Sequence, residues 1–157
     1  MKAASISEIK NELKGVTPAQ LTELCLRLAR FKKENKELLT FLLFEAHDLQ
    51  GYTQSVKAEI DEALHAVNWS NLYFAKKSVR KILRTTNKYS KYAGDKQVET
   101  ELLIYFCTAL KTSGKPFRKS PALLKLYQSQ LKKINTLVAT LHEDLQYDYV
   151  QQVAALD

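Results

Sequence analysis

Apolar residues recur every three or four positions along most of the chain, which is the repeat of an amphipathic α-helix. In the last third, the apolar positions from Leu124 to Leu145 follow one another in steps of three and four. No segment sustains the strict alternation of apolar and polar residues that is typical of a half-buried β-strand. The pattern therefore predicts helices throughout and no sheet.

Residues that favour helix ends divide this pattern into about seven helices. Thr17 and Ser120 each precede a proline that suits a first helical turn, whereas Gly51 is expected to break the chain and Gly94 to end a helix. The helix at 34–46 has little polar surface, so we expect it to lie in the centre of the fold. The predicted ranges are 6–13, 17–32, 34–46, 56–67, 72–92, 95–109 and a last helix from 120, with a break near 142 left open.

Composition agrees with a helical protein that folds as one domain. The chain has 157 residues, of which only four are glycine and three are proline, so long helices with tight connections are expected. We predict a single all-α domain over residues 1–157, in which the helices stack as antiparallel hairpins into a compact bundle or a short α-solenoid. Residues 142–157 are predicted to form an acidic C-terminal helix or tail.

Two apolar stretches resemble each other within the chain. "ELLTFLLF" begins at Glu37 and "ELLIYFCT" begins at Glu101. Two copies of a helical unit would suit an α-solenoid. The other interpretation, which we favour, is that buried leucine-rich helices look alike.

The stretches "KKENKELLTFLLFEAHD" and "AKKSVRKILR" resemble small uncharacterised all-helical bacterial proteins. The serial helices also resemble HEAT-type and armadillo-type repeats, although no repeat consensus is present. These resemblances imply an all-helical fold and bring no known activity.

The net charge of +7 is concentrated in one part of the chain. Residues 67–141 hold fifteen lysines and arginines against three acidic residues, whereas residues 1–66 hold nine against ten. Residues 142–157 hold four acidic residues and no basic one. No acidic residue occurs between Glu62 and Asp95.

The predicted helix at 72–92 carries most of this charge on one face. On a helical wheel its apolar residues share the side that would face the core, and Tyr89 falls on that side. Like charges one turn apart cost a few tenths of a kcal/mol per pair, so stability alone would favour mixed signs. Five cations fall within a sector of about 80°, with Arg80 at its border: Lys77, Lys81, Arg84, Lys88 and Lys91.

A continuous row of positive charge attracts polyanions. Cations in the loop at 111–121 could extend the row, and Tyr92 and Phe117 among them suit the stacking of bases in single-stranded nucleic acid. The predicted polyanion-binding residues are Lys77, Arg80, Lys81, Arg84, Lys88, Lys91, Tyr92, Lys115, Arg118 and Lys119.

We therefore expect a non-enzymatic binding module whose partner is nucleic acid or another polyanion. The alternative is a helical-repeat scaffold that binds an acidic protein. A charged face that is simply solvated is the third interpretation. The acidic C-terminal residues could fold back and screen the basic row, and the sequence leaves the oligomeric state open.

Residues that could perform catalysis or bind a metal are sparse. Asp61 and His65 share a helix face, but two ligands do not make a metal site, so a surface ion pair is expected. The stretch "SGKP" lacks the upstream glycine and the Ser or Thr of a phosphate-binding loop. Cys25 and Cys107 lie among core-type positions and are expected to be buried thiols. We expect no catalytic residue, metal or cofactor, while a site assembled from distant carboxylates stays open.

The first residues contain no apolar signal segment. The most apolar run is far shorter than the ~20 residues of a membrane-spanning helix. These features favour a cytoplasmic location and no membrane partner.

Overall fold

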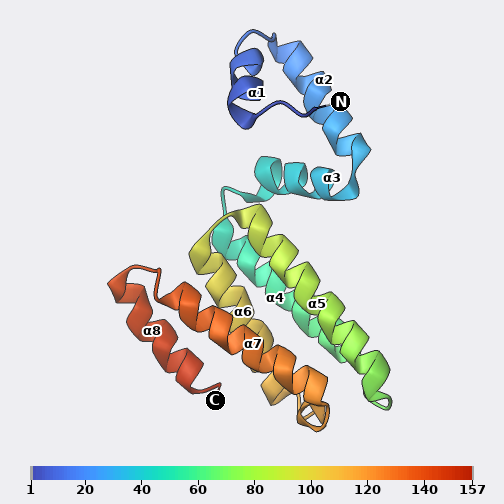
Figure 1. The fold of residues 1–157 in the computed structure, drawn as a ribbon, viewed down its shortest axis with the longest axis vertical. Coiled ribbons are helices and arrows are strands. Elements are labelled where there is room, and N and C mark those ends of the chain that lie inside the picture. The colour runs from blue at the N-terminus through green and yellow to red at the C-terminus, as the bar shows by residue number, and fades with distance from the viewer. Residues whose placement is uncertain (1, 157) are drawn as a thin grey trace. The chain divides into compact units, whose positions relative to one another are not determined.

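The computed structural model describes residues 2–156, and every regular element among them is a helix (Figure 1). The predicted all-α class is therefore confirmed. The eight α-helices within this range are α1 (Ile6–Leu13), α2 (Pro18–Phe31), α3 (Lys33–Thr40), α4 (Leu49–His65), α5 (Leu72–Ala93), α6 (Lys96–Thr112), α7 (Pro121–Val138) and α8 (Glu143–Ala154). A π-helical segment, η1 (Phe41–Glu45), and a short 3₁₀ helix, η2 (Phe117–Lys119), complete the set.

The chain divides into two compact units, unit 1 (Met1–Phe44) and unit 2 (Glu45–Asp157). The expectation of one domain over residues 1–157 stays a prediction.

Two of the three α-helices of unit 1 begin with side-chain caps, and Phe41, a buried apolar side chain of this unit, lies in η1 and not in an α-helix. Ser5 and Glu8 form a capping box on α1, and Thr17 and Gln20 form another on α2. The helices α2 and α3 pack against each other. None of α1, α2 and α3, as far as the structure describes them, contains a buried residue.

Unit 2 is a series of antiparallel helical hairpins, in which each helix from α4 to α8 packs against the next and α4 also packs against α6 (Figure 1). The centre of this arrangement is α6, which contacts α4, α5 and α7. Its fully buried apolar side chains are Leu102, Leu103, Phe106, Cys107 and Leu110.

The prediction that the helix at 34–46 is central is wrong. Leu43 and Phe44 are 63% and 68% exposed, and α3 ends at Thr40, where the π-helical segment begins. An apolar sequence shows that a segment can be buried, but the packing of other helices decides which segment receives neighbours on every side. In unit 2 that segment is α6.

Gly51 does not break the chain, contrary to expectation. It lies in the first turn of α4, and its backbone N–H donates to the Asp48 carboxylate at 2.8 Å. A Cβ atom at position 51 would lie 2.3 Å from the Asp48 Oδ2 atom. The glycine therefore leaves room for the side chain that caps the helix.

The last predicted helix does break, because α7 ends at Val138 and α8 begins at Glu143, with His142 as its N-cap. The acidic C-terminal segment forms a helix packed against α7, and the Tyr127 hydroxyl donates to the Leu156 carbonyl at 2.8 Å. Within residues 2–156, no salt bridge joins α8 to α5. Screening of the basic row by this segment thus receives no support from the described contacts.

We predict that Asp48→Ala lowers the free energy of unfolding of the protein by about 1 kcal/mol, because the first turn of α4 loses its capping acceptor. Urea denaturation followed by circular dichroism measures the change. Asp48→Asn keeps an acceptor at the same position and should lose far less. An equal loss in both variants would contradict the capping role.

Candidate polyanion-binding surface

The orientation of α5 is fixed by its buried face. The Asn71 side chain caps the helix by accepting from the backbone N–H of Tyr73 at 2.9 Å, and Gly94 ends it with a φ of 63°. Between these ends the helix packs against α4 and α6. Its buried residues are Ala75, Val79, Ile82, Leu83, Thr86 and Ser90.

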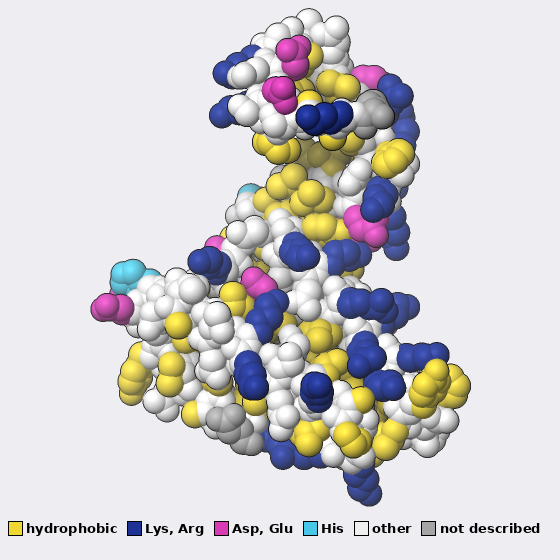
Figure 2. Space-filling view, viewed as in Figure 1, with side chains coloured by type: hydrophobic (Ala, Val, Ile, Leu, Met, Phe, Trp, Pro, Cys, Tyr) yellow, Lys and Arg dark blue, Asp and Glu magenta, His cyan; other side chains and the backbone are white. Residues whose placement is uncertain are grey.

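The opposite face of α5 presents cations to the surroundings. Of the predicted residues, Lys77, Arg80, Lys81, Arg84 and Lys91 are exposed, and Lys88 is half-buried. Within residues 2–156, none of the five exposed cations forms a salt bridge with a carboxylate. Figure 2 shows dark-blue side chains gathered over α5 on this face of unit 2, with few magenta ones beside them.

Four of these cations surround one hollow on the helix surface, which has a volume of about 650 Å³. The Lys77 ammonium also lies 4.5 Å from the centre of the Tyr73 ring, a contact that favours a cation. The lining residues of the hollow are Lys77, Ser78, Arg80, Lys81, Leu83 and Arg84. Two ammonium groups, two guanidinium groups and a hydroxyl are donors suited to phosphate or carboxylate oxygens.

The three carboxylates of residues 67–141 are all engaged elsewhere. Asp95 caps α6 by accepting from the Val98 N–H at 2.9 Å. Glu99 lies 2.6 Å from the Lys133 ammonium. Glu101 lies 2.5 Å from the ammonium of a lysine on α4. The positive charge on the outer face of α5 is therefore not neutralised by these residues.

The predicted residues Lys88 and Tyr92 lie in a different setting, farther along α5. The Lys88 ammonium lies 5.1 Å from the centre of the Tyr89 ring and 5.9 Å from that of Tyr92. The two ring centres are 6.0 Å apart, and both tyrosines are half-buried. Tyr92 is thus part of an aromatic pair next to a cation.

The predicted loop cations Lys115, Arg118 and Lys119 are exposed, but η2 in their midst packs against α7. Phe117 is only 2% exposed and lies 5.3 Å from Tyr127, centre to centre. The expectation that Phe117 could stack with bases is therefore wrong, because its ring belongs to the core. The structure brings four predicted residues together around the hollow and places the loop cations on another element.

The sequence pattern did not predict a polar cluster that lies between α4 and α6. Lys57 pairs with Glu101, and one turn along both helices the Tyr105 hydroxyl donates to the Asp61 carboxylate at 2.5 Å. This hydrogen bond is the main reason why the pKa of Tyr105 is raised to about 12. Asp61 thus has a different partner from the expected His65. The matched i, i+4 spacing of the two pairs is the signal that could have indicated them.

Residues suited to metal or thiol chemistry are not assembled in the described structure. No group of three or more His, Cys, Asp and Glu side chains within residues 2–156 could hold a metal ion. Cys25 and Cys107 are free thiols, and burial raises the pKa of Cys107 to about 12. The sulfur of Cys107 therefore stays protonated and unreactive at neutral pH.

Among the described helices, none combines the length and apolar character needed to cross a membrane.

Comparison of the chain with protein-family models, with curated proteins and with solved structures finds no match.

We predict that Tyr105→Phe destabilises the protein by about 1 kcal/mol at neutral pH, because Asp61 loses its hydrogen-bond donor. The pKa of Tyr105 is raised in the folded state, so its contribution is full below pH 10 and is lost as the pH rises through about 12. Urea denaturation at several pH values should show the two proteins converging across that range.

All other groups are common to both proteins and cancel in the difference. Tyr147→Phe, at an exposed tyrosine of α8, should change the free energy of unfolding little at neutral pH. A constant difference between wild type and Tyr105→Phe up to pH 12 would contradict the role of this hydrogen bond.

Proposed function

We propose that the protein is a non-enzymatic binding module that holds a polyanion, in the first place nucleic acid, on the outer face of α5. The observation that carries the proposal is the set of exposed, unneutralised cations around the hollow on α5. Like charges this close repel one another and are not compensated within residues 67–141. A bound polyanion would supply the missing negative charge.

Lys77, Arg80, Lys81 and Arg84 would contact successive phosphates and release their condensed counterions. Lys88 and Lys91 would extend the contact along the helix, over about 21 Å from Lys77 to Lys91. Contacts of this kind recognise the backbone and not the bases, so weak sequence specificity is expected. No cofactor or metal takes part in the proposed binding.

The salt dependence of binding tests this function. Four neutralised phosphates of duplex DNA should give a slope of log K against log salt of about −3 to −4. Fluorescence anisotropy with labelled DNA and RNA at several KCl concentrations measures the slope. The variant Arg80→Gln/Arg84→Gln should reduce its magnitude by about 2.

A matched control removes the same charge from another helix. Lys125 and Lys132 are exposed on α7, so Lys125→Gln/Lys132→Gln changes the net charge equally. This control should bind almost as the wild type does. Equal losses in both variants, or no salt-dependent binding by the wild type, would overturn the proposal.

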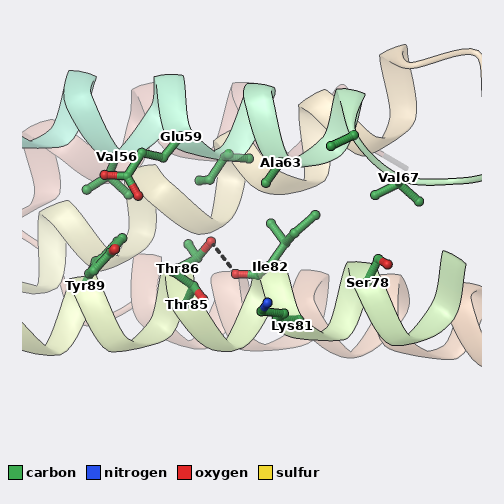
Figure 3. Close-up of a pocket in the computed structure, with 12 residues that line it drawn as sticks. Val56, Glu59, Ala63, Val67, Ser78, Lys81, Ile82, Thr85, Thr86 and Tyr89 are labelled. Carbon is green, nitrogen blue, oxygen red and sulfur yellow. Dashed lines mark hydrogen bonds between the residues drawn. The ribbon is translucent and has the colours of Figure 1, made fainter. Parts of the chain in front are cut away.

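The second candidate function is a helical scaffold that binds an acidic, amphipathic protein segment. A groove of about 290 Å³ runs between α4 and α5, lined by apolar residues such as Val56, Ala63 and Ile82 (Figure 3). Lys81 from α5 and Glu59 from α4 also line it. An apolar groove beside a basic face suits an amphipathic helix with acidic residues.

A pull-down after nuclease treatment separates the two candidates. A protein partner that survives digestion and is lost with Ala63→Glu, which places a carboxylate in the groove, would favour the scaffold. Recovered material that disappears on digestion would favour nucleic acid. Ala63→Glu is expected to leave the salt-dependent binding to DNA largely intact, because Ala63 is not among the residues of the hollow.

The proposal includes a cytoplasmic location. The free thiols of Cys25 and Cys107 favour a reducing compartment.

A further inference from the structure

Unit 1 exposes apolar side chains that a folded unit normally buries. Its three α-helices contain no buried residue within the described range, and Ile6 and Phe31 are 81% and 82% exposed. Capping boxes on α1 and α2 and the buried Phe41 of η1 show a folded unit, but the three α-helices leave most of their apolar side chains without a core to cover them. A unit of about 40 residues is at the lower limit of what folds without further support.

The exposed apolar area of unit 1 is large enough for a stable interface. Its twelve large apolar residues that are at least one-third exposed would together present on the order of 1,000 Å², taking about 200 Å² for a fully exposed side chain. A standard interface buries about 800 Å² on each partner.

Within unit 1, the two packed helices α2 and α3 form a groove of about 560 Å³. Leu26, Leu39, Leu43 and Phe44 line it, and its polar lining is basic, with Arg30, Lys33 and Lys36. Arg30 and Lys33 already have carboxylate partners in Glu23 at 3.5 Å and Glu37 at 3.6 Å, whereas Lys36 forms no salt bridge within the described chain. The groove therefore suits an apolar helix that carries negative charge.

The helix α1 has this character. Ile6, Ile9 and Leu13 follow at helical spacing and are all exposed. Glu8 and Glu12 lie between them, against a single Lys10. The short connection from Lys14 to Thr17 ties α1 to the start of α2, whereas the groove extends to Phe44 at the far end of the unit.

We propose that unit 1 is a dimerisation element, in which α1 of one copy of the chain lies in the α2–α3 groove of a second copy. In the proposed dimer a two-fold axis relates the copies, so that each gives its α1 to the groove of the other and the assembly closes with two identical contacts. The apolar side chains of α1 then enter the groove, and Glu12 faces its basic residues. Dimerisation uses no residue of the α5 face, so it can be tested independently of polyanion binding.

Light scattering coupled to size exclusion, with the full chain freed of nucleic acid, tests the dimer. The molar mass measured for the wild type should be twice the 18.0 kDa of one chain. Ile6→Glu and Leu43→Glu should each give monomers, and because both residues are exposed in the single chain, these substitutions remove no core packing. Val150→Glu, at an exposed apolar residue of α8 in unit 2, should remain dimeric.

Disulfide cross-linking tests whether α1 of one copy lies in the α2–α3 groove of the other. Chains with Cys25→Ser and Ile6→Cys are mixed with chains that carry Cys25→Ser and Leu43→Cys, and oxidation should link the two kinds of chain. A monomeric wild type, as expected if the apolar surface is covered by another protein, would overturn the proposal. A dimer that survives both glutamate substitutions, or that forms no mixed disulfide, would overturn it as well.

Discussion

Burial of α6 is the constraint on which unit 2 depends. Leu102, Leu103 and Phe106 are completely buried, and they are covered because α4, α5 and α7 all pack on this helix. Full burial of a large apolar side chain contributes about 1.5–3 kcal/mol, so the neighbours of α6 cannot rotate without losing several such contributions. This packing fixes the orientation of α5 about its own axis and therefore determines which of its side chains face outward.

The outward face of α5 shows how a local cost can persist in a folded protein. Repulsion between like charges one helical turn apart is small for each pair, and the buried face of α5 offsets it. What makes the face unusual is that Asp95, Glu99 and Glu101 are all committed to a cap or to other lysines. Among the residues that the structure describes, the five exposed cations of this face form no salt bridge, and residues that do not serve stability often serve binding.

The two units solve the problem of apolar surface in different ways. Unit 2 hides its apolar residues within a stack of hairpins, and its exposed residues are mainly charged or polar. Unit 1 forms helices of the same amphipathic kind but leaves most of their apolar residues exposed. The same local rules therefore produce a core in one unit and an exposed apolar surface in the other, because a core needs enough helices to surround it.

The helical class and most helix ends follow from local sequence patterns alone. Caps such as Thr17, Asn71 and Asp95 act on backbone groups two or three residues away, so their effect does not depend on the rest of the fold. The inward face of α5 was likewise predictable, since a repeat of 3.6 residues alone places the apolar positions together. Gly51 was misread because its role depends on the side chain of Asp48, which a glycine by itself does not reveal.

Which helix is central, which cations share a hollow and which aromatic rings are buried depend on the tertiary packing. Phe117 lies in the core because η2 packs against α7, and Lys57 pairs with Glu101, which lies 44 residues farther along the chain. These outcomes depend on which helices become neighbours, and that choice is made by the summed packing of whole helix faces. No short stretch of sequence contains that sum, which is why the charged row could be located in advance but its uncompensated state could not.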